Sequence, residues 1–364
     1  MRPGWWPRTS EALPPAISRE TAISGRRATG SASDQASKKF NRVGAPVSLD
    51  PVTAERLKSV LATVVAIPVT PFDDVGQVDW AAHARVVGRL VEGGVTVVTP
   101  NGNTGEFYAL TPDEARRVTE SAIKAVKAAG PAGGHAEILA GVGLDTATAI
   151  DAARHAADAG AGMIMIHQPV HPYLSAEGWL EYHQAVAGAV PDTGVVLYIR
   201  GTRIDGELIG RLGESCPNVI GVKYGMRDPV LFAAAARDVR PGRFTWLAGL
   251  AELTAPGLWA VGAQGFTSGL VNVAPAIPAA MLAALRRGDF EAAMTTWDAI
   301  RAFEELRGAD SSADNVSVVK EALAQIGVCG RAVRPPSRLL PGPPREQVAS
   351  ILAAWGLDRA EASA

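Results

Sequence analysis

The chain has 364 residues, of which 47% are apolar and 20% are charged, and its formal net charge is -2 at pH 7. This composition is typical of a globular protein and excludes a strongly basic overall field of the kind that attracts nucleic acid. Its uninterrupted apolar runs are too short to span a membrane, so we expect neither nucleic acid nor membrane as a partner.

The cysteines and histidines show no metal-binding or disulfide pattern. Cys216 and Cys329 are far apart and form no CxxC pair, which is typical of a reducing compartment, so we expect a cytoplasmic protein. The six histidines show no HExxH spacing, and no predicted strand is followed by GxGxxG. We therefore expect no metal and no nucleotide cofactor.

The first fifty residues differ in composition from the rest of the chain. They are rich in Ser, Ala, Pro and Arg and have no sustained apolar period. This composition favours disorder, although an arginine-rich and serine-rich start also resembles an organellar transit peptide. We interpret residues 1–55 as a disordered N-terminal extension.

From about residue 62, short apolar runs alternate with Ala-rich helical patterns. Strands this apolar are typical of a parallel sheet that is covered by helices. One helical pattern, 111–130, begins with a capping box from Thr111 to Glu114. The strand-like runs are ATVVAIPVTPF (62–72), VTVVTP (95–100), AEILAGV (136–142), GMIMIH (162–167), GVVLYIR (194–200), VIGVKYG (219–225), FTWLAGL (244–250) and GFTSGL (265–270).

Eight strand–helix alternations predict an α/β fold, a (β/α)8 TIM barrel over residues 56–285. A doubly wound open sheet is the alternative. The pattern beyond the barrel is helical, with one Pro-rich break at 334–344. We expect residues 286–364 to form a C-terminal helical extension packed against the barrel.

Candidate functional residues lie where the predicted strands end, which is where such a barrel carries its chemistry. Lys223 lies late in the sixth strand, Tyr198 lies at the same level of the fifth, and Arg200 and Arg203 follow Tyr198. A lysine in an apolar strand has two interpretations. Either its stem is buried and its ammonium reaches water, or burial keeps its amine neutral so that it attacks a carbonyl.

The loop GNTGE (102–106), after the second strand, favours the second interpretation. Its backbone N–H groups, with Gly102 giving them room, can hold a carboxylate, and Asn103 and Thr104 lie in the same loop. Ser268, at the end of the eighth strand, is expected to line the mouth. An amine, a phenol and an anion cradle are what an enzyme needs to form a Schiff base with a 2-oxo acid.

The chain resembles the dihydrodipicolinate synthase/N-acetylneuraminate lyase family of class I aldolases and dehydratases. The resemblance implies Lys223 as the Schiff-base lysine, Tyr198 as the proton-transfer tyrosine and Thr104 as a carboxylate contact. It also implies a small-molecule 2-oxo acid as substrate and a homo-oligomer, either a dimer or a tetramer. It runs from about residue 58 to 357 and rests on PVTPF (68–72), GNTGEFYALTPDE (102–114), PYL (172–174), GAQGFTSGLVNVAP (262–275) and VVKEALAQIGVCGRAVRPP (318–336).

Departures from the synthase branch of this family bear on the substrate. Asn103 replaces the first of that branch's two threonines, and Leu174 replaces its second tyrosine. The motifs TGEFYALTP and PYL are more similar to the 5-dehydro-4-deoxyglucarate dehydratase branch. That branch also often has an arginine two residues after the tyrosine, as Arg200 is here, although Ile199 departs from its usual asparagine.

We therefore expect a lyase that acts on a deoxy-oxo-sugar acid such as 5-dehydro-4-deoxyglucarate, by dehydration or by aldol cleavage. One alternative is 4-hydroxy-tetrahydrodipicolinate synthase, which condenses pyruvate with aspartate semialdehyde. The other is a non-catalytic protein that binds a 2-oxo acid, because a barrel alone does not establish catalysis.

Overall fold

A computed structural model describes residues 49–129 and 136–357, and its strands close into a barrel in sequence order. Strand β1 pairs in parallel with both β2 and β8, which closes the sheet. An open doubly wound sheet would leave two unpaired edges, so the TIM barrel prediction is confirmed. The strands are β1 (Val64–Ala66), β2 (Val97–Val98), β3 (Glu137–Val142), β4 (Met163–Ile166), β5 (Gly194–Ile199), β6 (Val219–Tyr224), β7 (Thr245–Ala248) and β8 (Gly265–Ser268).

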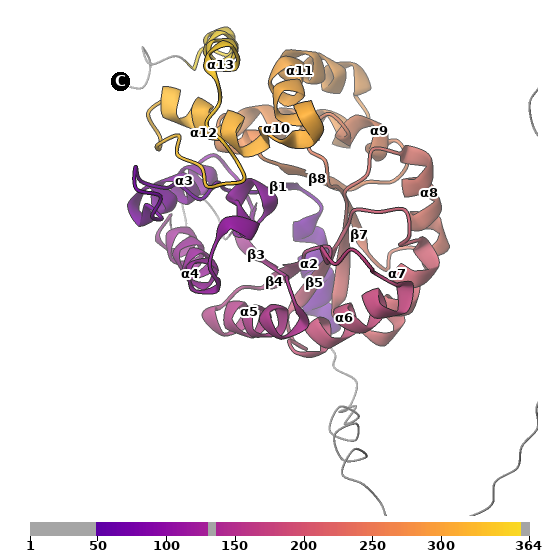
Figure 1. Ribbon diagram of the computed structural model, residues 1–364. Coiled ribbons are helices and arrows are strands. Elements are labelled where there is room, and N and C mark those ends of the chain that lie inside the picture. The colour runs from indigo at the N-terminus through magenta and orange to yellow at the C-terminus, as the bar shows by residue number, and fades with distance from the viewer. Residues whose placement is uncertain (1–48, 130–135, 358–364) are drawn as a thin grey trace, which may run out of the picture. The chain divides into compact units, whose positions relative to one another are not determined.

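Helices cover the outside of the barrel, and Figure 1 shows α3 to α8 as a ring around the strands. The predicted capping box is present at the start of α4. Glu114 N donates to Thr111 Oγ1 at 3.2 Å, and Thr111 N donates to Glu114 Oε2 at 2.9 Å. The helices are α3 (Trp80–Glu92), α4 (Pro112–Ala129), α5 (Thr146–Ala159), α6 (Ala176–Gly188), α7 (Gly206–Ser215), α8 (Pro229–Asp238), α9 (Ala255–Trp259) and α10 (Ala276–Arg286), and the short 3-10 helices are η1 (Asn103–Gly105), η2 (Phe107–Ala109) and η4 (Leu270–Asn272).

Side chains alternate along each strand between the inside of the barrel and the helix layer. The inward side chains form a separate apolar core, which includes Val65, Val97, Met165 and Leu247. The outward side chains pack against the surrounding helices in a second, larger core. This alternation decides which residues at a strand end can reach the mouth of the barrel.

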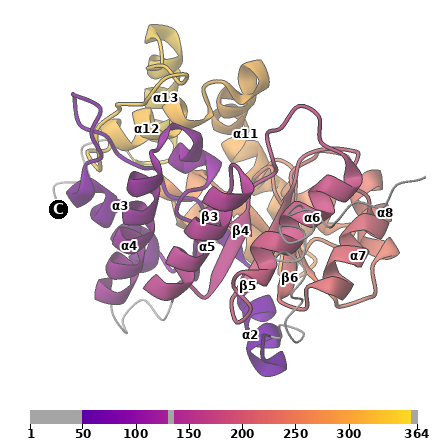
Figure 2. The same ribbon diagram turned by 60° about the horizontal axis from the view of Figure 1, so that its bottom comes forward.

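Helix α2 (Pro51–Leu61) closes the end of the barrel where the strands begin. Its Leu57 and Leu61 pack into the inward core, and Figure 2 shows it at the opposite end from α12 and α13. The predicted disordered range was therefore too long, because residues 51–55 are helical. The side chain of Asp50 accepts Thr53 N–H at 2.9 Å and caps the helix, and Pro51 suits its first position. The prediction for residues 1–48 lies outside the described residues.

The C-terminal part consists of α11 (Phe290–Ser312), α12 (Asn315–Gln325) and α13 (Gly342–Ala354). Helix α11 is interrupted near its end, because Asp310 and Ser311 have positive φ angles. Helix α12 packs against η1 and η4, which follow strands β2 and β8. The C-terminal helices therefore lie at the end of the barrel that carries the predicted site. No helix in residues 49–129 or 136–357 is long and apolar enough to cross a membrane.

Candidate active site

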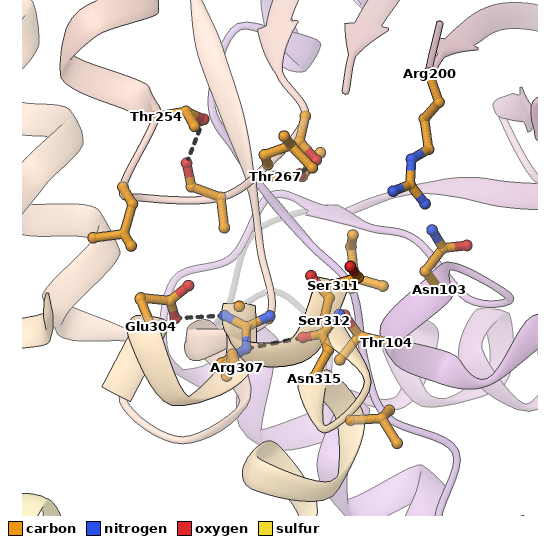
Figure 3. A pocket seen from close by; sticks show the side chains of 18 of the residues that line it. Asn103, Thr104, Arg200, Thr254, Thr267, Glu304, Arg307, Ser311, Ser312 and Asn315 are labelled. Atoms are coloured by element: carbon orange, nitrogen blue, oxygen red, sulfur yellow. Dashed lines mark hydrogen bonds and ion pairs between the residues drawn. The ribbon is translucent and has the colours of Figure 1, made fainter. Parts of the chain in front are cut away.

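A cavity of about 670 Å³ opens at the C-terminal ends of the strands. The predicted site residues that line it are Lys223, Tyr198, Asn103, Thr104 and Arg200. The structure therefore brings together residues from β5, β6 and the loop after β2 that lie far apart in the sequence. Figure 3 shows Arg200 extending toward Asn103 within this cavity.

Lys223 and Tyr198 lie directly opposite each other on neighbouring strands. Both side chains are buried, with 2% and 3% of their surfaces exposed, and the Lys223 Nζ lies 4.2 Å from the centre of the Tyr198 ring. The packing of Tyr198 explains why a glycine, Gly225, follows the strand that carries Lys223. A Cβ at that position would lie 2.7 Å from Tyr198 Cε2, so a larger residue would displace the tyrosine.

The environment of Lys223 favours its neutral form. Burial lowers the pKa of its amine to about 7, and the nearby positive charge of Arg200 acts in the same direction. An amine with the ordinary lysine pKa would be almost fully protonated at pH 7, whereas the Lys223 amine is neutral, with a free electron pair, in about half of the molecules. The amine is therefore prepared to act as a nucleophile.

The phenol of Tyr198 keeps its proton at neutral pH. Burial raises its pKa, while Arg200 and Asn103 partly oppose this shift. Asn103 Nδ2 donates to the Tyr198 hydroxyl oxygen at 3.3 Å, so the hydroxyl proton remains available for another acceptor. Tyr198 can therefore donate a proton beside the Lys223 amine.

The glycine loop borders the cavity, but only some of its residues line it. Thr104 is buried and lines the cavity, whereas Gly102 lies behind the lining. A Cβ at Gly102 would lie 2.4 Å from Ile67 Cγ2, so this glycine is required by packing. The loop is anchored on its far side, where Thr70 Oγ1 donates to Gly105 O at 2.8 Å and Lys320 on α12 pairs with the buried Glu106.

Besides Gly102, two of the predicted site residues do not line the cavity. Ser268 was expected at the mouth, but its hydroxyl binds the carboxyl of Glu252 because it lies on the outward face of β8. Its neighbour Thr267 points inward and lines the cavity. Arg203 is exposed, and its Nη1 donates to Leu174 O at 3.1 Å instead of entering the cavity.

Sequence reasoning missed the part of the lining that the C-terminal helices contribute. Glu304, Arg307 and Asn315 line the cavity from α11 and α12 and are linked to one another by hydrogen bonds (Figure 3). Ser311 and Ser312 add hydroxyls at the interruption of α11. A Glu–Arg pair three residues apart on a helix is usually an exposed surface pair. No pattern in the sequence indicated that this face turns toward the barrel.

The residues in the described ranges show no group of three or more His, Cys, Asp or Glu side chains that could hold a metal ion. What the cavity offers is a neutral amine, a protonated phenol, amide and hydroxyl groups, and arginines. This set can form an imine, move protons beside it and bind anionic groups.

Comparisons with known proteins agree on a family and differ on the activity. The model of the Dihydrodipicolinate synthetase family matches residues 60–355. A probable 5-dehydro-4-deoxyglucarate dehydratase of Ectopseudomonas mendocina is 34% identical over 65% of this chain and 76% of the relative. One of Acinetobacter baumannii is 30% identical over 83% of this chain and 99% of the relative. Among solved structures, the dihydrodipicolinate synthase of Bacillus clausii has a TM-score of 0.78 and 36% identity, covering 82% of this chain and 99% of that one.

Proposed function

The chain belongs to the dihydrodipicolinate synthetase family and is a lyase, and on that premise we propose that Lys223 forms an imine with a 2-oxo acid while Tyr198 transfers protons beside it. The observation that carries this proposal is the buried Lys223 amine, whose pKa is lowered to about 7 next to a protonated tyrosine. Such a pair has no use in a barrel core, and its location at the strand ends supports a catalytic role. A protein that only binds 2-oxo acids would not need a neutral amine.

We further propose that the substrate is a 2-oxo acid with a second carboxylate and a hydroxylated chain, such as 5-dehydro-4-deoxyglucarate. The named activities of relatives do not decide the substrate, because the synthase of Bacillus clausii is as similar to this chain as the dehydratases are. Support comes from Arg200, which lines the cavity and could bind the second carboxylate. Asn103 supports it as well, since its amide contacts Tyr198 where the synthase branch has a hydroxyl.

The chemistry follows from the positions of the substrate's groups. The neutral Lys223 amine adds to the ketone, and loss of one water gives the imine. The imine withdraws electrons from the neighbouring carbon, so that carbon releases a proton and an enamine forms. The hydroxyl on the next carbon then leaves as a second water, with its proton supplied by an acid such as Tyr198. The double bond that results remains conjugated with the imine until water releases the amine.

A panel assay tests the substrate proposal. Purified protein would be offered 5-dehydro-4-deoxyglucarate, related sugar acids, N-acetylneuraminate, and pyruvate with aspartate semialdehyde. We expect turnover of the dicarboxylic sugar acid, and a rise in KM of at least about tenfold in the Arg200→Gln variant. Arg203→Gln should have a smaller effect, because its side chain lies outside the cavity. Turnover of pyruvate with aspartate semialdehyde alone would show that the synthase alternative is correct.

A further inference from the structure

Arg307 is a buried cation in the wall of the cavity, and the imine chemistry gives it no role. Its Nη1 donates to Glu304, its Nε donates to Asn315 Oδ1 at 3.1 Å, and only 7% of its side chain is exposed. Within residues 49–129 and 136–357, its Nη2 makes no hydrogen bond, since the bonds of this guanidinium come from Nη1 and Nε. A guanidinium carries five N–H donors in a fixed plane, so this side chain is held rigidly and still has donors to offer.

The unused donors of Arg307 lie beside the glycine loop. A Cβ at Gly269 would lie 2.3 Å from Arg307 Nη2 and 3.2 Å from Thr104 Oγ1, so these two groups flank the same point. Thr104 is the residue expected to contact the carboxylate next to the ketone. The glycine at 269 leaves open the space between a hydroxyl and a guanidinium that both line the cavity.

The chain is distorted next to this guanidinium. Asp310, Ser311 and Ser312 have φ angles of 46°, 56° and 70°, a conformation that residues with a Cβ adopt at an energetic cost. The distortion ends α11 so that Ser311 and Ser312 line the cavity close to Asn315 (Figure 3). Strained backbone of this kind is retained where the surrounding structure requires it, and here it borders the site.

The charge balance around Arg307 suits an anionic ligand. Glu304 neutralises the guanidinium, and Glu252 is the next carboxyl in the same buried cluster. Burial, together with the charge of Glu304, raises the pKa of Glu252 to about 8, so it is mostly protonated at neutral pH. The cluster therefore carries no net negative charge that would repel a carboxylate.

We propose that Arg307, together with Thr104, binds the substrate carboxylate next to the ketone, while Arg200 binds the second carboxylate. This inference rests on the proposed function and names the residue that anchors its substrate. A bond from a guanidinium to a carboxylate is directional as well as charged, and it would fix the ketone relative to the Lys223 amine. The C-terminal helices would then form part of the binding site.

The test compares two paired substitutions on α11. Replacing both Glu304 and Arg307 by Gln removes the guanidinium without leaving a buried charge unpaired. The matched control replaces Arg301 and Glu305 by Gln, since that pair lies on the same helix and faces solvent. Calorimetry would measure the Kd of pyruvate, which has one carboxylate, and of 2-oxoadipate, which has two.

We expect the Glu304→Gln, Arg307→Gln variant to bind both acids about 10 to 100 times more weakly than the wild type. Arg200→Gln should weaken the binding of 2-oxoadipate much more than that of pyruvate, and the control should bind both acids normally. Unchanged affinity for pyruvate in the Glu304, Arg307 variant would overturn the proposal, as would a wild type that binds neither acid. If that variant does not fold, Arg307→Lys decides, because it keeps the charge but loses the planar donor set: a loss of at least about fivefold supports the proposal, and unchanged affinity overturns it.

Borohydride trapping of the same samples separates this inference from the proposed function. If the wild type binds both acids by calorimetry but gives no trapped adduct, the Schiff-base function is wrong. The carboxylate role of Arg307 then still stands or falls by the affinity of its variants.

Discussion

At the scale of single residues, the proposed chemistry depends on one amine in an apolar strand. Lys223 lies in VIGVKYG, and Gly225 leaves room for Tyr198 on the neighbouring strand β5. Burial lowers the pKa of the Lys223 amine to about 7. The lowered pKa prepares the amine for attack, but burying this group reduces the free energy of unfolding. Function and stability therefore make opposite demands on this residue.

Replacing Lys223 with Met should abolish imine formation and stabilise the protein at neutral pH. The unfolded amine keeps its proton up to its ordinary pKa of 10.5, whereas the folded amine loses it near pH 7. The unfolded state binds more protons between these values, so the cost to the wild type is on the order of a few kcal/mol at pH 7 and shrinks as the pH rises toward 10. Denaturant unfolding at pH 7 and pH 9 measures this difference. Lys124→Met, an exposed control, should change little at either pH.

The pH profile of kcat/KM should rise through a pKa near 7, because only the neutral Lys223 amine attacks a ketone. The positive charge of Arg200 contributes to the lowered pKa. In Arg200→Gln the amine should hold its proton more strongly, so the rising limb should move to higher pH whatever the loss in rate. A limb that stayed in place, or moved to lower pH, would show that the two side chains are not coupled.

At the scale of elements, the apolar runs predicted all eight strands, because a strand buried on both faces leaves few polar residues to confuse the pattern. The strand ends alone were enough to predict that Lys223, Tyr198 and the loop with Thr104 line one cavity. Ser268 was misplaced because the face of a strand that a residue occupies depends on register, which the run of apolar letters does not reveal.

The C-terminal helices could not have been predicted as part of the site. Arg307 reaches the cavity only because α11 and α12 pack over the strand ends, and that packing depends on contacts between segments distant in sequence. The start of α2 was predictable in principle from Asp50 followed by Pro51, a common helix start, but the surrounding composition of the first fifty residues obscured it.

Helix α12 should hold the glycine loop through the buried Lys320–Glu106 pair. Lys320→Met leaves the Glu106 carboxylate buried without its partner, so it should cost about 3–5 kcal/mol of unfolding free energy and raise KM as the loop loosens. Adding Glu106→Gln should restore most of the stability, because a Gln Oε1 can still accept the Arg334 N–H that Glu106 accepts at 2.9 Å. Breaking the exposed Arg211–Glu177 pair is the control and should cost less than about 1 kcal/mol.

At the scale of the whole molecule, the described residues form a barrel closed at one end by α2 and lined at the other by the C-terminal helices. Deleting residues 1–48 should leave melting temperature and turnover unchanged, because their composition cannot bury a core. Deletion through residue 62 removes Leu57 and Leu61 from the inward core and should lower the melting temperature by many degrees. A large loss from the shorter deletion would contradict the predicted extension.

The cytoplasmic location and the homo-oligomeric assembly expected from the sequence remain predictions. Both depend on surroundings that a single chain does not carry.

Imine formation at Lys223 is tested most directly by borohydride reduction in the presence of pyruvate, followed by intact-mass measurement and peptide mapping. Reduction converts an imine into a stable amine, so the site of attack is preserved. We predict one covalent adduct per chain, located on Lys223, and none in Lys223→Met. An adduct on another lysine, or an unmodified wild type under conditions where pyruvate binds, would contradict it.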